Sequence, residues 1–339
     1  MTMSSTNPYT VTRKSGTPSR RRNDFLLLVG LLLLVIFGLT GLAAATGWEN
    51  IIAQISRLNW IQVMGLFALS LLNYTLRSLR WHIFAQKLGI GTTIFQNFRH
   101  YLGGFAMTAT PARAGELVRM RWLRRETGWR FEKTAPLMLG DRASDLAAMA
   151  IILGSAVVLS GSGIVGAIPV ALLALGGALV ATRPQILAAL ADTGYRAVKR
   201  WPRLFARVRS AARSLAKFSD RRTMSVATII GVAGWFAEIY AFFLLLGWMG
   251  AEIALPTAAA IFIFSTLAGS LVGAPGGVGG TEAAMIALLS LEGIPLETSV
   301  PATAIIRFTT LWFAISIGLI VFPIAEHYSK KAADALENN

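Results

Sequence analysis

The chain has 339 residues, of which 54% are hydrophobic and only 14% are charged. This balance exceeds ordinary globular usage and indicates a membrane protein. The absence of cysteine excludes disulfides, thiolate catalysis, iron–sulfur clusters and cysteine-based zinc sites. The net charge of +15 is accompanied by no nucleic-acid recognition motif, so we expect no nucleic-acid partner.

The positions of the cations predict the orientation in the membrane. Of the 32 Lys and Arg residues, 27 lie between or beside apolar runs, in 1–24, 77–87, 119–133, 183–222 and 324–339. Such flanks are typical of a cytoplasmic face, where Lys and Arg meet anionic lipid headgroups. We therefore expect a multi-pass protein of a bacterial inner membrane, with a basic cytoplasmic tail at 1–24 and a cytoplasmic C-terminal tail at 324–339.

Six apolar runs reach the length of about 20 residues that a helix needs to cross a bilayer. In chain order they are 25–46, 58–76, 134–160, 164–182, 224–248 and 300–323. The first run has 22 residues, whereas the apolar region of a cleavable signal peptide has about 7–15. We interpret this run as an uncleaved first span, so the sequence predicts six full transmembrane helices.

Two further apolar stretches are interrupted near their middles. The stretch 94–118 contains Pro111, and the stretch 256–291 contains the run Pro275–Gly280, and both interruptions break helices. Cations flank the first stretch on both sides, whereas only acidic residues flank the second. We expect two re-entrant helical hairpins, the first entering from the cytoplasm and the second from outside, which gives eight membrane segments in all.

The basic loop 183–222 has apolar residues separated mostly by three or four positions, with arginines between them. This is helical periodicity. A basic amphipathic helix of this kind is typical of the membrane surface. The alternative is a solvated helix packed on the protein.

Landmarks of the first hairpin recur in the second in the same order. A glycine-containing stretch leads to Pro, then Glu, then Pro, then Arg, at Pro111, Glu116, Pro136 and Arg142 and again at Pro275, Glu282, Pro301 and Arg307. The last Pro and Arg are 6 residues apart in both halves. Because the hairpins are expected to open to opposite sides, we predict an inverted repeat of about 58–160 and 224–323 within one transmembrane domain, 25–323. Carriers built this way hold substrate near the midplane, between broken helices.

Nine charged residues fall within the membrane stretches. They are Arg99, Arg113, Glu116, Asp141, Arg142, Asp145, Glu238, Glu282 and Arg307. An unpaired charge in hydrocarbon costs about 2.5–3.5 kcal/mol or more, so these groups should face one another or a wet cavity. Asp141, Arg142 and Asp145 share one helical face, either as a structural salt-bridge cluster or for handling a substrate or proton.

Arg307 has no acid within one helical turn. It therefore needs a distant carboxylate such as Glu282 or an anionic ligand, and we favour ligand binding or gating because guanidinium suits phosphate. Nearby, the irregular backbone of Pro275, Gly276, Gly277 and Gly279 precedes a helix start at Thr281 and Glu282, where an anion or headgroup can bind. The alternative is a tight packing turn with Thr281 and Glu282 as caps.

Motifs for enzymatic chemistry are missing. The three histidines, His82, His100 and His327, are too scattered for a metal site or a triad, and no zinc-protease motif or nucleophile elbow is present. We expect no enzyme activity, no metal and no cofactor.

Three segments carry a family resemblance. Thr110–Glu116 followed by Arg119, Asp141–Asp145 and Ala274–Glu282 resemble the lysylphosphatidylglycerol synthase transmembrane-region family of flippase-like integral membrane proteins. In two-domain members, the membrane part moves aminoacylated phosphatidylglycerol between leaflets and a soluble C-terminal domain makes it. This sequence ends about 16 residues after its last expected span, so the resemblance implies a stand-alone member without the synthase domain. Stand-alone relatives are linked with other lipids, including hopanoid-type and isoprenoid-linked molecules.

Together these features predict a flippase-like translocator of a lipid with an anionic or phosphate-bearing headgroup. Arg142 and Arg307 are expected to hold the headgroup, while Glu116 and Glu282 cap the hairpins or balance those arginines. Arg113, Asp141, Asp145 and the proline–glycine turn complete the expected substrate site. The alternatives are a secondary transporter of a small solute or ion, and a non-catalytic membrane subunit that assists a lipid- or glycan-modifying enzyme.

Overall fold

The structure is a computed structural model and consists of helices. It describes residues 56–108, 114–129, 131–159, 183–198, 202–218, 220–271 and 275–337, with isolated positions within 49–53 and 169–176. All regular secondary structure in these residues is helical, as the sequence predicts. The expected span 25–46 lies outside the described residues, as do Pro111, Arg113 and, apart from isolated positions, the expected span 164–182.

Long helices form the frame of the molecule. They are α3 (Trp60–Lys87), α6 (Phe131–Leu159), α10 (Arg221–Trp248) and a last helix made of α13 (Leu296–Arg307), the π-helical turn η5 (Phe308–Trp312) and α14 (Phe313–Glu337). Within the described residues, three stretches are long and apolar enough to cross a membrane: Thr134–Leu159, Arg222–Trp248 and Leu296–Leu336. They contain most of the expected spans 134–160, 224–248 and 300–323. The chain is therefore a multi-pass membrane protein.

Two expected boundaries differ from the helices. Helix α3 does not end near residue 76 but continues to Lys87, and the last helix continues from 323 to Glu337. The expected C-terminal tail is thus largely helical. Glu326 of α14 accepts hydrogen bonds from Arg121 and Trp122 of α5 (Ala114–Thr127), so this extension packs on the protein.

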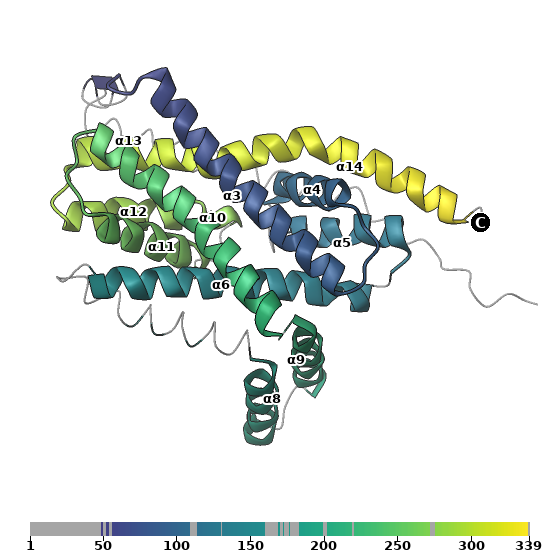
Figure 1. Cartoon of the computed structure of the whole chain (residues 1–339). Helices are drawn as coiled ribbons and strands as arrows, with labels where there is room; N and C mark the ends of the chain where they lie inside the picture. The colour runs from purple at the N-terminus through teal and green to yellow at the C-terminus, as the bar shows by residue number, and fades with distance from the viewer. Residues whose placement is uncertain are drawn as a thin grey trace, which may run out of the picture.

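Both interrupted stretches are broken helix pairs. The first comprises α4 (Ile94–Gly104), η1 (Phe105–Met107) and α5; the second comprises α11 (Leu255–Leu271), η4 (Pro275–Gly277) and α12 (Gly280–Leu291). The two helices of each pair contact each other. In Figure 1, α4 and α5 lie at one end of the long helices α6 and α14, whereas α11 and α12 lie at the other end.

Several helices begin at capping residues that the sequence places there. Asn59 and Thr93 form capping boxes at the starts of α3 and α4, in which each side chain accepts from a backbone N–H three residues later. Asp220 caps α10 by accepting from the backbone N–H of Thr223 at 2.9 Å. Such caps satisfy backbone donors that the first helical turn leaves unpaired.

The apolar interior is divided into two parts. Helix α3 packs along α10, and the two cross the middle of the molecule in Figure 1. One core joins α6, α10, α11, α12 and α13, and the other joins α3, α4, α5, α10 and α14. Tyr74 and Phe105 of the second core and Met149 and Trp235 of the first line the same cavity, so this cavity lies where the two cores meet.

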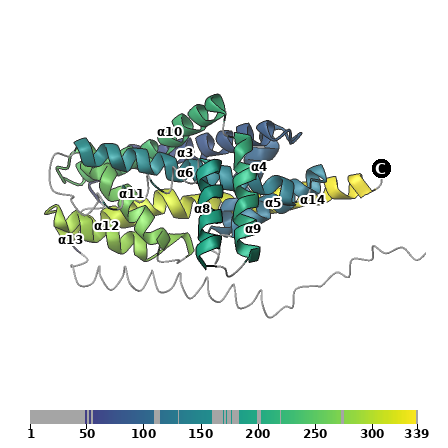
Figure 2. The same ribbon diagram turned by 90° about the horizontal axis from the view of Figure 1, so that it is seen from below.

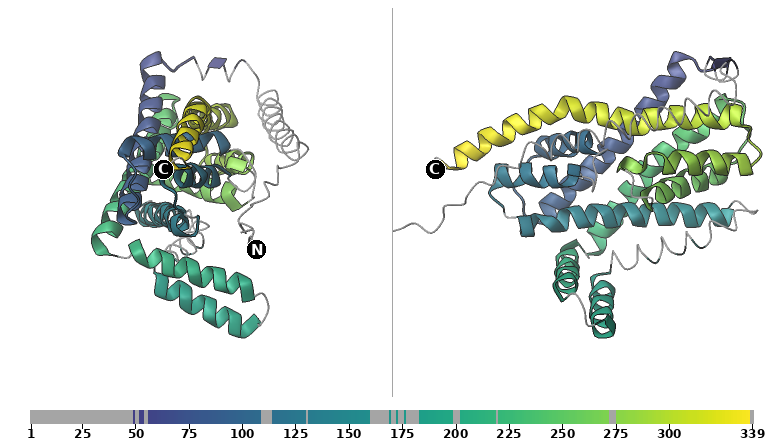
Figure 3. Two further views of the ribbon diagram at one scale, coloured as in Figure 1. Left: turned by 90° about the vertical axis from the view of Figure 1, so that its right-hand side faces the viewer. Right: turned by 180° about the vertical axis from the view of Figure 1, so that it is seen from behind.

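The basic loop 183–222 is helical, as its periodicity predicts. It forms α8 (Pro184–Val198) and α9 (Pro202–Leu215), which pack on each other, and α9 also contacts α6. Figure 2 shows the two helices side by side and crossing the long helices, and Figure 3 shows them projecting from the side of the bundle. Ile186, Leu190 and Tyr195 remain exposed. Contact between this helical loop and a membrane surface stays a prediction.

Candidate functional site

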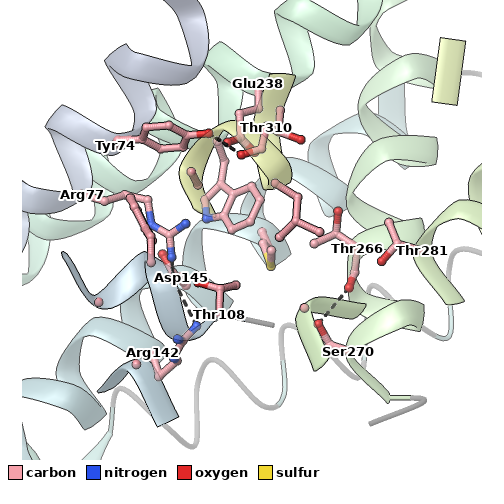
Figure 4. Close-up of a pocket in the computed structure, with 18 of the residues that line it drawn as sticks. Tyr74, Arg77, Thr108, Arg142, Asp145, Glu238, Thr266, Ser270, Thr281 and Thr310 are labelled. Carbon is pink, nitrogen blue, oxygen red and sulfur yellow. Dashed lines mark hydrogen bonds and ion pairs between the residues drawn. The ribbon is translucent and has the colours of Figure 1, made fainter. Parts of the chain in front are cut away.

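A cavity of about 340 Å³ lies between the two broken helix pairs. Thr108 and Gly115, which border the break of the first pair, line it together with Ser270, Gly276 and Thr281, which border the break of the second. Side chains of α3, α6, α10 and the last helix complete the wall (Figure 4). The wall is mixed, with aromatic and aliphatic residues beside several arginines and carboxylates.

Glycines allow the helices of each pair to approach closely beside the cavity. A Cβ atom on Gly115 would overlap the carbonyl oxygen of Gly104. In the second pair, a Cβ atom on Gly269 would overlap the hydroxyl of Thr281 and lie 2.7 Å from its backbone nitrogen. The glycine landmarks of the sequence therefore mark the same kind of contact in both pairs.

Each broken pair is joined to the following long helix by one glutamate–arginine ion pair. Glu116, in the first turn of α5, pairs with Arg142 of α6. Glu282, in the first turn of α12, pairs with Arg307 of α13, with Nε and Oε1 2.5 Å apart. Of the two partners foreseen for Arg307, a carboxylate or an anionic ligand, the carboxylate is present.

The proline–glycine turn is fixed by the same residues. Gly276, Gly277 and Gly279 have φ values of 66°, 69° and 86°, which residues other than glycine rarely adopt. The second carboxylate oxygen of Glu282 accepts from the backbone N–H of Gly279 at 2.6 Å, and Arg307 donates to the carbonyl of Gly276 at 3.1 Å. Glu282 therefore both caps α12 and balances Arg307.

The charge pattern places Arg77 and Arg80 among the cations that flank a span and meet lipid headgroups, but both are ion-paired with carboxylates inside the protein. The side chain of Arg80 is 0% exposed, and its Nη2 lies 2.6 Å from a carboxylate oxygen of both Asp141 and Asp145. Arg77 donates to the other oxygen of Asp145 at 2.5 Å. Because the buried face of α3 continues through Trp81 and Phe84, the apolar periodicity beyond residue 76 was the signal that places these arginines inside.

Arg119 was also counted as a flanking cation but is buried, with 5% of its surface exposed. Its guanidinium carbon lies 3.9 Å from the ring centre of Tyr101 and 5.6 Å from those of Trp81 and Phe105. Glu238 of α10, which also lines the cavity, is buried and accepts a hydrogen bond from the amide of Asn73 at 2.5 Å. Sequence reasoning gave neither residue a role.

The expected substrate-site residues separate into three groups. Those that line the cavity are Glu116, Arg142, Asp145, Gly276, Thr281 and Arg307. Pro275, Gly277, Gly279 and Glu282 form or fix the turn behind it. Asp141 binds Arg80 instead, and Arg113 lies outside the described residues.

Asp141, Arg142 and Asp145 share a helix face only in part. Asp141 faces α3, whereas Arg142 faces α5, and Asp145 lies between them, with its carboxylate 3.8 Å from Arg142 (Figure 4). Within the described part of the chain, no group of three or more His, Asp or Glu side chains is arranged to hold a metal ion. The polar side chains of the described cavity wall carry mainly guanidinium, carboxylate and hydroxyl groups.

The comparisons agree with this architecture. A UPF0104 membrane protein of Methanothermobacter thermautotrophicus is 26% identical to the chain over 338 residues, which covers 90% of this chain and 98% of that protein. The family described as lysylphosphatidylglycerol synthase TM region matches residues 26–318. Because this match spans most of the chain and contains both broken pairs and the charged cavity, the protein belongs to the lysylphosphatidylglycerol synthase transmembrane-region family.

Proposed function

We propose that the protein translocates a lipid between the leaflets of the membrane, and that the headgroup passes through the cavity between the broken helix pairs. The observation that carries the proposal is the cavity wall, to which both breaks and both glutamate–arginine pairs contribute. A polar, charged cavity suits a headgroup that hydrocarbon would exclude. Membership of a family named for a lipid synthase supports a lipid as the substrate.

The proposal includes an inverted repeat of about 58–160 and 224–323. Its support is the position of the two broken pairs at opposite ends of the long helices (Figure 1) and the matching glutamate–arginine pairs. In the proposed arrangement, α4–α5 is a hairpin that re-enters from the cytoplasm and α11–α12 one that re-enters from outside. Rocking of one half against the other would then expose the cavity alternately to each side.

The ion pairs refine the role of the two arginines. Arg142 and Arg307 are each bound to a glutamate in the described conformation, so a headgroup phosphate would compete with that glutamate for the positive charge of the guanidinium. We propose that they act as gates, in which each arginine exchanges its glutamate for the headgroup phosphate as its half opens. The two interactions are alternatives for the same guanidinium.

The proposal places both termini in the cytoplasm and the protein in a bacterial inner membrane. The basic helix α9 would then lie on anionic headgroups of the inner leaflet, with Ile186 and Leu190 of the neighbouring α8 among the lipid tails. No chemical step is assigned to the chain itself. An enzyme of lipid synthesis is the expected partner that supplies or consumes the substrate.

Lipid movement can be measured with fluorescent lipids in proteoliposomes that contain the purified full-length protein. We expect protein-dependent movement of a phosphate-bearing lipid and at least a tenfold loss in the double variant Glu116→Gln/Arg142→Gln, and likewise in Glu282→Gln/Arg307→Gln, since an ion pair at close range contributes on the order of 1.4 kcal/mol or more. Removing both partners leaves no uncompensated charge in the protein interior. Arg124→Gln is the control, because Arg124 is exposed on α5.

The assay also separates the competing functions. Movement of no lipid by folded protein, with uptake of a charged solute instead, would identify a secondary transporter. Movement of neither would favour a non-catalytic subunit that assists a lipid- or glycan-modifying enzyme.

A further inference from the structure

Among the described residues, four arginines line the cavity, and one of them differs from the rest. Arg77, Arg142 and Arg307 each have a carboxylate within 4.0 Å, supplied by Asp145, Glu116 and Glu282. For Arg119, no carboxylate of the described residues lies within that distance, although only 5% of the residue's surface is exposed. Asp141 acts on Arg119 only from beyond ion-pair distance, so among the described residues Arg119 has no direct ion pair.

The surroundings of Arg119 are built to admit a guanidinium. The rings of Trp81, Tyr101 and Phe105 lie around it. On α4, Gly104 has no side chain, and a Cβ atom there would overlap the Nε of Arg119. In the described part of the chain, Arg119 donates a side-chain hydrogen bond to the hydroxyl oxygen of Tyr101, and the buried Nε has no partner.

The rings stabilise the cation but leave its donors available. Aromatic faces attract a guanidinium through their quadrupoles. The N–H groups of a guanidinium lie in its plane, however, so a ring stacked over the face does not accept from them. A buried cation beside a cavity, with an unpartnered Nε and no carboxylate of the described residues within 4.0 Å, attracts an anion more strongly than an arginine that is already paired.

We propose that Arg119 is the anion-binding residue of the cavity and that its ligand is a phosphate ester. The planar fork of arginine donates two parallel hydrogen bonds to two phosphate oxygens, which a lysine cannot reproduce. The inference rests on the proposed function only for the source of the phosphate, a lipid headgroup. The inference gives the arginines different roles. Arg119 binds the phosphate, and Arg142 and Arg307 control its entry into and exit from the cavity.

The proposal can be tested by isothermal titration calorimetry, which measures ligand binding to the full-length protein in a neutral detergent. The probes are a short-chain phosphatidylglycerol, the diacylglycerol with the same chains and inorganic phosphate. We expect saturable binding of the phosphatidylglycerol but not of the diacylglycerol. Arg119→Gln should weaken this binding by about tenfold or more, as expected for a lost charge-assisted bidentate contact, and Arg119→Lys by a smaller factor.

Arg124→Gln is the matched control, because it makes the same change on the same helix at an exposed position. Unchanged phosphatidylglycerol affinity in Arg119→Gln would overturn the role of Arg119, whatever the protein transports. If Arg119→Gln does not fold, Arg119→Lys decides the matter, since this variant keeps the charge and loses the fork. A Lys variant that is folded and binds as tightly as the unmodified protein would equally overturn the proposal.

The source of the phosphate is decided separately. One outcome is that inorganic phosphate binds as tightly as the lipid and that this binding is also weakened in Arg119→Gln. That result would show that Arg119 forms an anion site, but the site would no longer support lipid translocation. Binding of the lipid at Arg119 without any lipid movement in proteoliposomes would leave the site intact and contradict the proposed function. The two ideas therefore fail in different measurements.

Discussion

At the scale of single residues, the interior charges do different jobs. Arg80 is enclosed between Asp141 and Asp145 and ties α3 to α6. Arg119 is buried against aromatic rings. The same residue type thus serves as a structural link in one place and as a candidate ligand contact in another, and the difference lies in whether a carboxylate is within reach.

The first expectation at this scale concerns stability. Arg80→Met removes one partner of a buried network and leaves the Asp141 carboxylate without its cation, while Asp145 keeps Arg77, so the free energy of unfolding should fall by about 3–5 kcal/mol. Denaturant titration of the purified protein, followed by loss of helical circular dichroism, measures the change. Arg124→Met, at an exposed position, should stay within about 0.5 kcal/mol of the original protein. Equal stabilities of the two variants would show that Arg80 is not a structural link.

At the scale of elements, the broken pairs depend on close contact between their two helices. Gly104 and Gly115 meet in the first pair, and Gly269 meets Thr281 in the second. Both contacts lie directly beside the cavity, because Gly104, Gly115 and Thr281 line it. A change that separates the helices therefore changes the shape of the candidate site as well as the stability.

Gly269→Ala should destabilise the protein. Its Cβ atom would overlap the Thr281 hydroxyl, and overpacking of this kind typically costs about 1–3 kcal/mol. Gly247→Ala is the matched control, because nothing lies within 4 Å of a Cβ atom at that position of α10 and alanine favours a helix over glycine by about 1 kcal/mol. Thermal melting in detergent should show a lower midpoint for Gly269→Ala and no decrease for Gly247→Ala. An unchanged midpoint for both variants would mean that α11 and α12 can move apart at Gly269 without loss of stability.

At the scale of the whole molecule, the two broken pairs lie at opposite ends of the long helices (Figure 1). The connection before α4 and the connection after α12 are then expected on opposite sides of the membrane. Because the sequence contains no cysteine, a thiol reagent can react only with a cysteine that is introduced, so labelling reports the accessibility of that one position.

Gly91→Cys, before α4, and Glu292→Cys, after α12, are both at exposed positions. In intact cells, a thiol reagent that cannot cross the membrane should label the cysteine at 292, whereas labelling at 91 should require permeabilised cells. A cysteine in place of Lys331, in the C-terminal helix, serves as the second cytoplasmic reference. Labelling of positions 91 and 292 from the same side would contradict the inverted repeat.

Much of the fold follows from the sequence alone. Apolar length identified α6, α10 and the last helix, because a bilayer demands about 20 apolar residues in a row. Proline and glycine located the breaks in 94–118 and 256–291, since these residues interrupt backbone hydrogen bonding whatever surrounds them. The landmark glutamates and arginines were correctly singled out as a set that requires partners.

The partners of these charges follow from the packing of the helices. Charge position along the chain predicts that Arg77, Arg80 and Arg119 are flanking cations, whereas Arg80 and Arg119 are buried and Arg77 is half-buried through contacts with other helices. An ion pair such as Glu282–Arg307 joins residues on different helices, so its geometry is set by packing rather than by local spacing. The membrane class, the breaks and the family resemblance can be read from the order of the amino acids, because apolar length and helix-breaking residues act locally. The structure decided which arginines are neutralised and which one faces the cavity unpaired by a described carboxylate, because desolvation and distance in three dimensions control both.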